Sequence, residues 1–351
     1  MLVLGIESSC DETAASVVEG GRRVMSSVVA SQHTIHAEYG GVVPELASRA
    51  HAERITPIVE QALAEAGVSI TDLDAVAVGH RPGLIGALLV GVSAAKALAW
   101  SLGIPLIGVD HVHAHLWAGM LEDDDSTDDV FPALGLVVSG GHSSIYRVDA
   151  PTRLMRLGAT IDDAIGEAYD KAASILGLSH PGGPRIDALA SEPNANDRTI
   201  DLPVSRLGKQ SLDFSFSGLK TALLYAVRGV PGRDGVFPSD GSELTAERKR
   251  DFAACFQRAA CRAVTIKLGR AIEQWQDEVP RSLIVGGGVS ANSRLRRELA
   301  SFAAEQRLRL VIPELRFCVD NAAMIAGLGA ELLATRQPDG LTLRATPTTA
   351  C

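Results

Sequence analysis

A histidine-rich segment is the most specific chemical signal in the sequence. Residues 110–115 read Asp-His-Val-His-Ala-His. If Asp110 caps a helix, His111 and His115 lie one turn apart on one face, where both imidazoles can reach a single metal ion. His113 then points elsewhere. The alternative is a pair of ordinary helix histidines with hydrogen bonds of their own, and a metal site also needs a third ligand from elsewhere in the chain.

Asp320 is the candidate for that third ligand. It stands in Phe-Cys-Val-Asp-Asn at residues 317–321, where we expect a short strand to deliver it to the start of a helix. A routine helix N-cap is the competing interpretation of the same aspartate. A zinc metalloprotease is disfavoured, because its signature places Glu directly after the first histidine and Val112 stands there.

Two further carboxylates lie near the start of the chain. The polar turn from Glu7 to Thr13 carries Asp11 and Glu12 at the tip of a predicted hairpin. These side chains could bind a metal or a water molecule, or orient an attacking group. A solvated turn with no chemical role is the alternative.

Three glycine-rich segments predict sites for a nucleotide or another anion. Residues 139–142 (Ser-Gly-Gly-His) and 286–292 (Gly-Gly-Gly-Val-Ser-Ala-Asn) each follow a predicted strand, and residues 182–184 (Gly-Gly-Pro) form a third such turn. Consecutive backbone N–H groups in such turns can bind a phosphate, and a flat glycine surface suits a base or ribose. None matches the Walker or Rossmann spacing, so a simple chain reversal is the alternative at each.

The elements that must position these residues form two similar patterns. An apolar strand at residues 2–6 leads through the polar turn into a second strand at 14–18, and residues 133–138 and 144–148 repeat this hairpin. Two hairpins of one kind, more than a hundred residues apart, indicate two related lobes. Further strands are predicted at 74–78, 105–109 and 283–285, and helices at 44–66, 88–102, 292–306 and 321–335. Residues 122–129 are expected to form an acidic linker, and 229–242 a surface loop.

Composition is consistent with a soluble two-domain enzyme. The chain has 351 residues, which at about 150 residues per domain predicts two domains. With 33 basic and 42 acidic residues, the net charge of −9 excludes a protein that coats nucleic acid through a basic surface. The sequence shows no basic leader, no apolar run of about 20 residues and no Cys-x-x-Cys pair, so we expect a cytoplasmic protein without a signal peptide.

Taken together, these motifs resemble the TsaD (Gcp) family of tRNA N6-adenosine threonylcarbamoyltransferases, in unbroken order from about residue 2 to about residue 330. The segments that carry the resemblance are 5–13, 40–45, 82–89, His111 with His115, 139–142, 182–184, 214–220, 287–292 and 320–321. Two positions depart from the family pattern. His113 stands where the family usually has Glu, and Gly79-His80-Arg81 replaces a stretch of small residues.

The resemblance implies an α/β fold of the two-lobed actin, Hsp70 and sugar-kinase type, built from tandem ribonuclease-H-like lobes. The N-terminal lobe would span residues 1–130, completed by the C-terminal helix at about 320–351, and the second lobe residues 131–319. The implied reaction transfers a threonylcarbamoyl group from threonylcarbamoyl-adenylate to N6 of adenosine 37, in tRNAs that read codons starting with A, and releases AMP. A TsaB-like paralogue and a small TsaE-like ATPase would be its partners.

The resemblance also assigns roles to residues. His111, His115 and Asp320 would bind one divalent ion, with iron and zinc both open. Asp11, Glu12 and His142 are the catalytic candidates, with Asp11 or Glu12 accepting the proton of the amine. The adenylate would contact Val137, Val138, Ser139, Gly140, Gly141, Asp170, Gly183, Asp187 and Asn292. The alternatives are an ATPase or kinase of the same fold, and a metal-dependent hydrolase.

Overall fold

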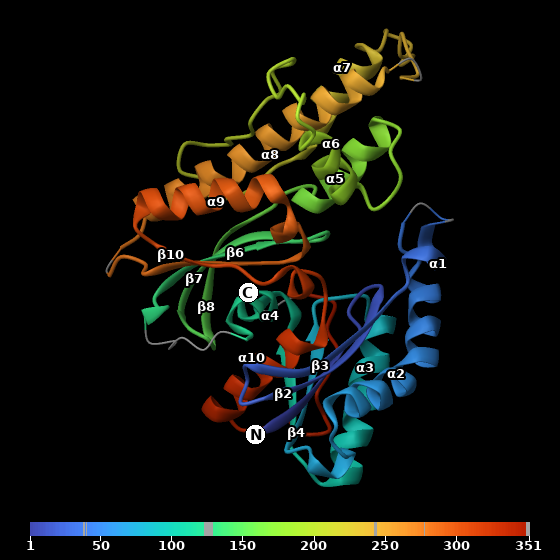
Figure 1. Cartoon of the computed structure of the whole chain (residues 1–351), viewed down its shortest axis with the longest axis vertical. Coiled ribbons are helices and arrows are strands. Elements are labelled where there is room, and N and C mark those ends of the chain that lie inside the picture. The colour runs from blue at the N-terminus through green and yellow to red at the C-terminus, as the bar shows by residue number, and fades with distance from the viewer. Residues whose placement is uncertain (38, 40, 123–128, 242–243, 277, 349–351) are drawn as a thin grey trace. The chain divides into compact units, whose positions relative to one another are not determined.

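The computed structural model describes the whole chain except residues 38, 40, 123–128, 242–243, 277 and 349–351 (Figure 1). The chain divides into two compact units. The first unit comprises Met1–Thr127, Asp149–Leu154 and Val311–Cys351, and the second unit comprises Asp128–Val148 and Met155–Leu310. Each unit is built on a five-stranded sheet, and the ends of β7, β8 and β10 fall at the boundaries between the units.

The sheet of the first unit has the strand order β3-β2-β1-β4-β5. Its strands are β1 (Leu2–Glu7), β2 (Glu12–Glu19), β3 (Arg23–Ser31), β4 (Ala75–Arg81) and β5 (Leu106–Asp110). The first three form an antiparallel meander, and β4 and β5 continue the sheet in parallel to β1. In this register Ile6 pairs with Val78, so Glu7 and Gly79 follow at the same end of the sheet.

Helices cover both faces of this sheet. Strand side chains alternate between the faces, and Leu4 and Ile6 pack with the buried sides of α2 (Pro44–Ala66) and α3 (Ile85–Leu102). Gly5 faces the opposite way, where a Cβ would lie 2.1 Å from the Ala322 carbonyl oxygen. The missing side chain therefore allows α10 (Ala322–Thr335) to pack closely on that face. Short helices α1 (His33–Ala37) and α4 (His111–Trp117) complete the unit.

Helix α3 is the one helix among the described residues that is long and apolar enough, by length and composition, to cross a membrane. In the structure it packs against β4 and α2. Ala87, Leu88 and Val92 on its inner side are fully or almost fully buried. One side of α3 thus contributes to the core of the unit, while Ile85, Leu89 and Trp100 are exposed.

The second unit repeats the plan of the first. Its sheet has the order β10-β9-β6-β7-β8, formed by β6 (Ala133–Val138), β7 (Ser143–Ala150), β8 (Arg153–Ala159), β9 (Ser282–Gly286) and β10 (Arg309–Val311). Strand β6 pairs antiparallel with β7 and parallel with β9. The helices of the unit are α5 (Ile165–Ile175), α6 (Gly182–Ala190), α7 (Ser217–Arg228), α8 (Ala246–Glu273) and α9 (Ser293–Gln306).

Most predicted elements are present, several with shifted ends. Both hairpins and the helix at 44–66 are confirmed. The sequence did not indicate the third strands β3 and β8, whose side chains are partly exposed and show no continuous apolar run. Of the expected acidic linker, residues 123–128 lie outside the described part. The described residues 229–241 contain neither helix nor strand, in agreement with a loop.

Two predictions about local structure are wrong. Residues 182–184 do not form a turn after a strand, because they open helix α6 and follow helix α5. No strand delivers Asp320 either, since β10 ends at Val311 and a 3-10 turn at Leu315–Phe317 follows it.

Candidate functional site

Helix α4 places two histidines at the end of β5. Asp110 ends the strand and caps the helix, with Oδ1 accepting hydrogen bonds from the backbone N–H of Val112 (3.1 Å) and of His113 (3.3 Å). Its Oδ2 lies 3.1 Å from Nε of Arg81. A capped first turn fixes the direction of the helix, so His111 and His115 lie on one face as their spacing predicts. Their ring centroids are 4.7 Å apart.

Asp320 meets both histidines. Its Oδ1 lies 3.6 Å from His111 Nε2 and 3.2 Å from His115 Nε2. Both imidazoles are buried, His115 completely. Three ligand atoms from these residues lie within 4.8 Å of one another, close enough to bind one ion. All three residues belong to the first unit.

The backbone around Asp320 is fixed by its neighbour. Asn321 is the N-cap of α10, where its Oδ1 accepts a hydrogen bond from the backbone N–H of Met324 at 2.9 Å. Its Nδ2 donates to the carbonyl oxygens of Val319 (2.8 Å) and Phe317 (3.2 Å). The cap predicted for Asp320 is therefore formed by Asn321, which leaves the Asp320 carboxylate directed at the histidines.

The three residues fit a divalent metal ion. Neither ring nitrogen of the fully buried His115 makes a hydrogen bond in the described part of the chain, although buried polar atoms are nearly always paired. The contact of its Nε2 with Asp320 is close but lacks hydrogen-bond geometry. A metal ion that accepts electron pairs from both His115 and Asp320 would account for the lack of hydrogen bonds at the buried imidazole. Two imidazoles and one carboxylate are a donor set suited to iron or zinc.

The charges around this point favour a cation. Burial disfavours the charged form of both imidazoles and lowers the pKa of His115, while for His111 the attraction of Asp320 and Glu7 outweighs burial and raises the pKa. The pKa of Glu12 is raised by burial and then by Asp320 and Asp11. Several carboxyl groups thus share a poorly solvated region, where positive charge is stabilising.

Asp11 and Glu12 lie in a rigid turn beside this group. His33 Nε2 is 3.2 Å from Glu12 Oε1 and 3.8 Å from Asp11 Oδ2. Fully buried His51 fixes the same turn, with Nε2 3.0 Å from the Cys10 carbonyl oxygen and Nδ1 2.8 Å from the Thr13 hydroxyl. Asp11 and Glu12 expose only 17% and 13% of their side chains. The alternative of a solvated turn is therefore wrong.

The turn at residues 139–142 lies at the end of β6 in the second unit. The Ser139 N–H donates to the His142 carbonyl oxygen at 2.7 Å, and the His142 N–H donates to the Ser139 hydroxyl at 3.1 Å. A Cβ at Gly287 would lie 2.4 Å from the Val138 carbonyl oxygen, so only glycine lets the segment after β9 approach this turn. Cβ atoms at Gly140 and Gly141 would meet nothing within 4 Å. The backbone there is open to a ligand.

The predicted adenylate residues Asp187 and Asn292 are joined by a residue that the sequence did not single out. Gln257 of α8 donates from Nε2 to Asp187 Oδ1 (3.0 Å) and accepts at Oε1 from Asn292 Nδ2 (2.8 Å). Asp187 also accepts from the backbone N–H (3.0 Å) and hydroxyl (2.8 Å) of Ser293. The available signal was one glutamine within the mostly apolar segment 252–261.

The remaining predicted contacts lie in the same unit. Val137 and Val138 are buried in β6, and His142 is half-buried after it. Asp170 Oδ1 accepts a hydrogen bond from the Gly182 N–H at 2.6 Å and so holds the start of α6. At Gly183, the next residue, a Cβ would meet nothing within 4 Å, which leaves this backbone open as well.

The aromatic motif at residues 214–220 has a structural role. Phe214 and Phe216 are almost fully buried and stack at 5.9 Å. The Asp162 carboxylate accepts hydrogen bonds from the hydroxyls of Ser215 and Ser217, both at 2.6 Å, and from the backbone at the start of α7. Burial alone would raise the pKa of Asp162, but these hydrogen bonds outweigh it and lower the pKa.

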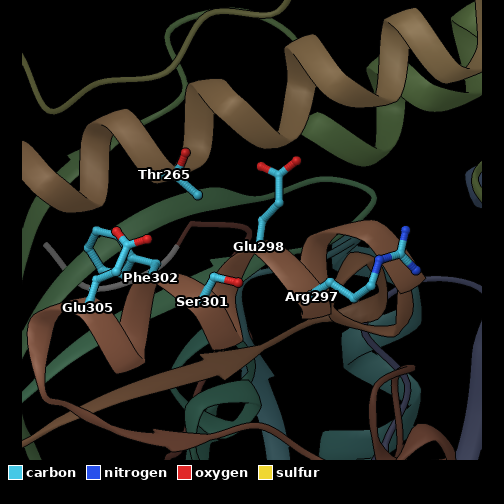
Figure 2. A pocket seen from close by; sticks show the side chains of 6 residues that line it. All are labelled: Thr265, Arg297, Glu298, Ser301, Phe302 and Glu305. Atoms are coloured by element: carbon cyan, nitrogen blue, oxygen red, sulfur yellow. The ribbon is translucent and has the colours of Figure 1, made fainter. Parts of the chain in front are cut away.

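A separate surface pocket lies between α8 and α9 (Figure 2). Thr265 contributes to it from α8, and the other lining residues come from α9: Arg297, Glu298, Ser301, Phe302 and Glu305. None of the predicted site residues lines this pocket. Its mixture of both charge signs with one phenyl ring identifies no ligand class.

Comparison with solved structures identifies the fold class. Component A of the (R)-2-hydroxyglutaryl-CoA dehydratase from Acidaminococcus fermentans matches with a TM-score of 0.53 over 95% of this chain and 100% of that chain, at 12% sequence identity. Full-length HypF in its phosphate- and nucleotide-bound form matches with a TM-score of 0.55 over 94% of this chain and 46% of that chain, also at 12% identity. The predicted fold class of actin, Hsp70 and sugar kinases is confirmed.

Sequence comparison identifies the family within this class. The profile of TsaD, described as tRNA N6-adenosine threonylcarbamoyltransferase, matches residues 23–327. A curated relative of that description from Trichlorobacter lovleyi is 50% identical over 348 residues, which cover 99% of this chain and 96% of the relative. One from Sorangium cellulosum is 47% identical and covers 98% of this chain and 95% of the relative. The chain belongs to the TsaD family of acyltransferases that modify tRNA.

Proposed function

We propose that this chain transfers the threonylcarbamoyl group of threonylcarbamoyl-adenylate to N6 of adenosine 37, in tRNAs that read codons starting with A, and releases AMP. The observation that carries the proposal is the convergence of His111, His115 and Asp320 in a member of this family. Among the described residues, neither ring nitrogen of buried His115 has a hydrogen-bond partner. We place one divalent ion, iron or zinc, on these three side chains.

The reaction needs positioning more than a protein nucleophile. The donor is a mixed carbamoyl–phosphate anhydride and is already activated, whereas the lone pair of the adenine amine is delocalised into the ring. A bond forms between N6 and the carbamoyl carbon, the bond from that carbon to the phosphate oxygen breaks, and AMP leaves with the electron pair. The amine loses one proton. Catalysis then rests on holding the amine against the carbon and stabilising the developing negative charge.

The first unit supplies the acid–base groups. A bound divalent ion supplies positive charge for the oxygens of the threonylcarbamoyl group. Asp11 or Glu12 accepts the proton of the amine, because both carboxyl groups belong to the rigid turn beside the ligand residues. Asp11→Asn and Glu12→Gln variants, compared at saturating donor, identify which of the two it is.

The second unit binds the adenylate. The open backbone at Gly140 and Gly141 receives the phosphate, beside Ser139, whose own N–H donates to the His142 carbonyl oxygen and closes the turn. The nucleoside of the adenylate is bound by the segments that contain Asp170, Gly183, Asp187 and Asn292. Val137 and Val138 of β6 complete the proposed contacts. The side chain of Asn292 is engaged at both ends, by Gln257 and by the Leu295 N–H (2.9 Å). Its contribution to the nucleotide is therefore to hold the backbone before α9.

Partners complete the enzyme. A net charge of −9 gives the chain little general attraction for a polyanion, so we expect weak tRNA binding by the chain alone. A TsaB-like paralogue and a TsaE-like ATPase would supply the rest of the tRNA-binding assembly in the cytoplasm.

One reconstitution tests the proposal. The full-length protein is incubated with unmodified tRNA, threonylcarbamoyl-adenylate and the two partner proteins, and the nucleosides are then analysed by mass spectrometry. We expect threonylcarbamoyladenosine in the tRNA and one AMP released per modification. Steady ATP hydrolysis or sugar phosphorylation without tRNA, and no modified nucleoside, would instead support the ATPase or kinase alternative.

A further inference from the structure

Glu7 is a buried carboxylate that touches a candidate metal ligand and has no part in the steps above. It ends β1 and is fully buried. Its Oε2 lies 3.0 Å from His111 Nδ1, and its Oε1 accepts a hydrogen bond from the Ser9 N–H at 2.5 Å. Each carboxylate oxygen therefore has a separate polar partner, as a buried polar group requires.

The adjacent strand leaves room for this carboxylate. Gly79 of β4 follows Val78, the partner of Ile6, and so lies beside Glu7 in the sheet. A Cβ at Gly79 would be 2.6 Å from Glu7 Oε2 and 3.3 Å from Glu7 Cδ. The backbone of Gly79 does not have the positive φ that would by itself favour glycine. The absence of a side chain at residue 79 thus accommodates Glu7.

A second group lies near the same nitrogen. The Ser9 hydroxyl is 3.2 Å from His111 Nδ1, slightly farther than Glu7 Oε2. A hydroxyl can either donate to or accept from an imidazole nitrogen, so it leaves the tautomer undetermined. If Glu7 Oε2 accepts the hydrogen bond at 3.0 Å, the proton of this contact is on His111 Nδ1.

We propose that Glu7 is a positioning residue that holds His111 in the tautomer with a free Nε2, directed at the point shared with His115 and Asp320. This role of Glu7 rests on the proposed metal site, because it concerns the orientation of one of its ligands. A carboxylate that accepts the outer N–H of a ligating histidine fixes the ring and strengthens it as a ligand. His115 Nδ1 has no hydrogen-bond partner among the described residues, so the two imidazoles are supported differently.

The test measures Co²⁺ binding by the full-length, metal-free protein, through chelator competition and the visible absorption of the bound ion. In Glu7→Gln one acceptor oxygen is replaced by an NH2 group, which is a donor. This NH2 group then faces either the His111 Nδ1–H or the Ser9 N–H, and neither pair can form a hydrogen bond. We expect the affinity for Co²⁺ to fall by about 10–100-fold and the absorption bands to shift. Gly79→Ala keeps the carboxylate but displaces it, and should lower the affinity in the same direction.

Two neighbouring variants serve as controls. Ser8→Ala removes a fully buried hydroxyl that donates to the Ala87 carbonyl oxygen at 3.0 Å. Ser9→Ala removes the second group near Nδ1. Both should keep the wild-type affinity and spectrum. Thermal unfolding of each metal-free variant separates a loss of fold from a loss of ligand positioning.

The outcomes are distinguishable. If Glu7→Gln and Gly79→Ala bind Co²⁺ like the wild type while His111→Ala does not, Glu7 has no positioning role and the proposed metal site stands. If Ser9→Ala alone loses affinity, the hydroxyl is the partner and the inference is wrong. If the wild type binds no metal, both proposals fail. Should Glu7→Gln not fold, Gly79→Ala decides on the same measurements.

Discussion

The two sheets share one strand order but present different chemistry at their strand ends. In the first unit, β1 and β5 end in Glu7 and Asp110, which are followed by side chains able to bind a metal or move a proton. In the second unit, β6 ends at Val138 and β9 at Gly286, and the turns that follow them contain glycines with open space around them, at Gly140, Gly141 and Gly288. The same sheet topology therefore presents side-chain ligands in the first unit and backbone N–H groups in the second unit.

This difference predicts that the two units tolerate different substitutions. A side-chain site depends on the identity of a few residues and on the groups that orient them, as Glu7 orients His111. A backbone site depends on glycine, either because a Cβ would collide, as at Gly287, or because a ligand needs the space, as we propose for Gly140. The predictions below separate these cases.

The largest effect is expected at Asp320. Asp320→Ala removes the only carboxylate of the proposed ligand set, so we expect bound metal and threonylcarbamoyl transfer to fall together. Each should fall by more than about 100-fold, because a direct ligand matters more than a residue that only supports a ligand. Metal analysis of the purified variant and the tRNA assay measure the two quantities. A variant that keeps full activity without metal would refute the role of the ion.

A pair of glycine variants tests the backbone site. Gly287 has φ +92° and a Cβ there would lie 2.4 Å from the Val138 carbonyl oxygen, so Gly287→Ala should lower the free energy of unfolding by about 1–3 kcal/mol or more. Gly140→Ala has open space and no positive φ, so we expect normal stability with weaker AMP binding. Calorimetric unfolding and AMP titration distinguish them. Unchanged AMP affinity in Gly140→Ala would contradict the phosphate assignment.

Variants of Gln257 test whether binding of the nucleoside depends on hydrogen bonds within the protein. Gln257→Leu leaves Asp187 and Asn292 each without one partner, at a cost of about 1–3 kcal/mol for the buried amide of Asn292. We expect the KM for threonylcarbamoyl-adenylate to rise more than kcat falls. Gln257→Glu, which keeps the acceptor for Asn292 but places a second carboxylate against Asp187, should be impaired too. A KM equal to that of the wild type in both variants would remove Gln257 from the site.

The smallest effect concerns the acid stability of the second unit. The folded-state pKa of Asp162 lies below its usual value, so its stabilising contribution is present above about pH 4 and is lost as the pH falls through the folded-state pKa. Asp162→Ala should cost about 1 kcal/mol at pH 6, as loss of a helix cap does, and the difference from wild type should shrink at acid pH. A difference independent of pH would show that the charge does not matter.

The sequence predicts many local elements and the candidate ligands, but it indicates neither the helices α5 to α8 nor the groups that support the candidate ligands. Helix 44–66 has the predicted ends because its apolar spacing and its terminal glycine are local signals. His111 and His115 follow from one turn of helix. Asp320 is a candidate from its place before a predicted helix, and the family resemblance assigns it as the third ligand. Glu7 near His111 and Gln257 between Asp187 and Asn292 depend on contacts between residues 35 to 104 positions apart, which no local pattern encodes.

The measurement closest to the central claim is X-ray absorption at the metal edge of the zinc-loaded protein. We predict two imidazole nitrogens and at least one carboxylate oxygen at about 2.0–2.2 Å, with the imidazole contribution reduced in His115→Ala. A spectrum without imidazole scattering, or one that His115→Ala leaves unchanged, would contradict the assignment of this site.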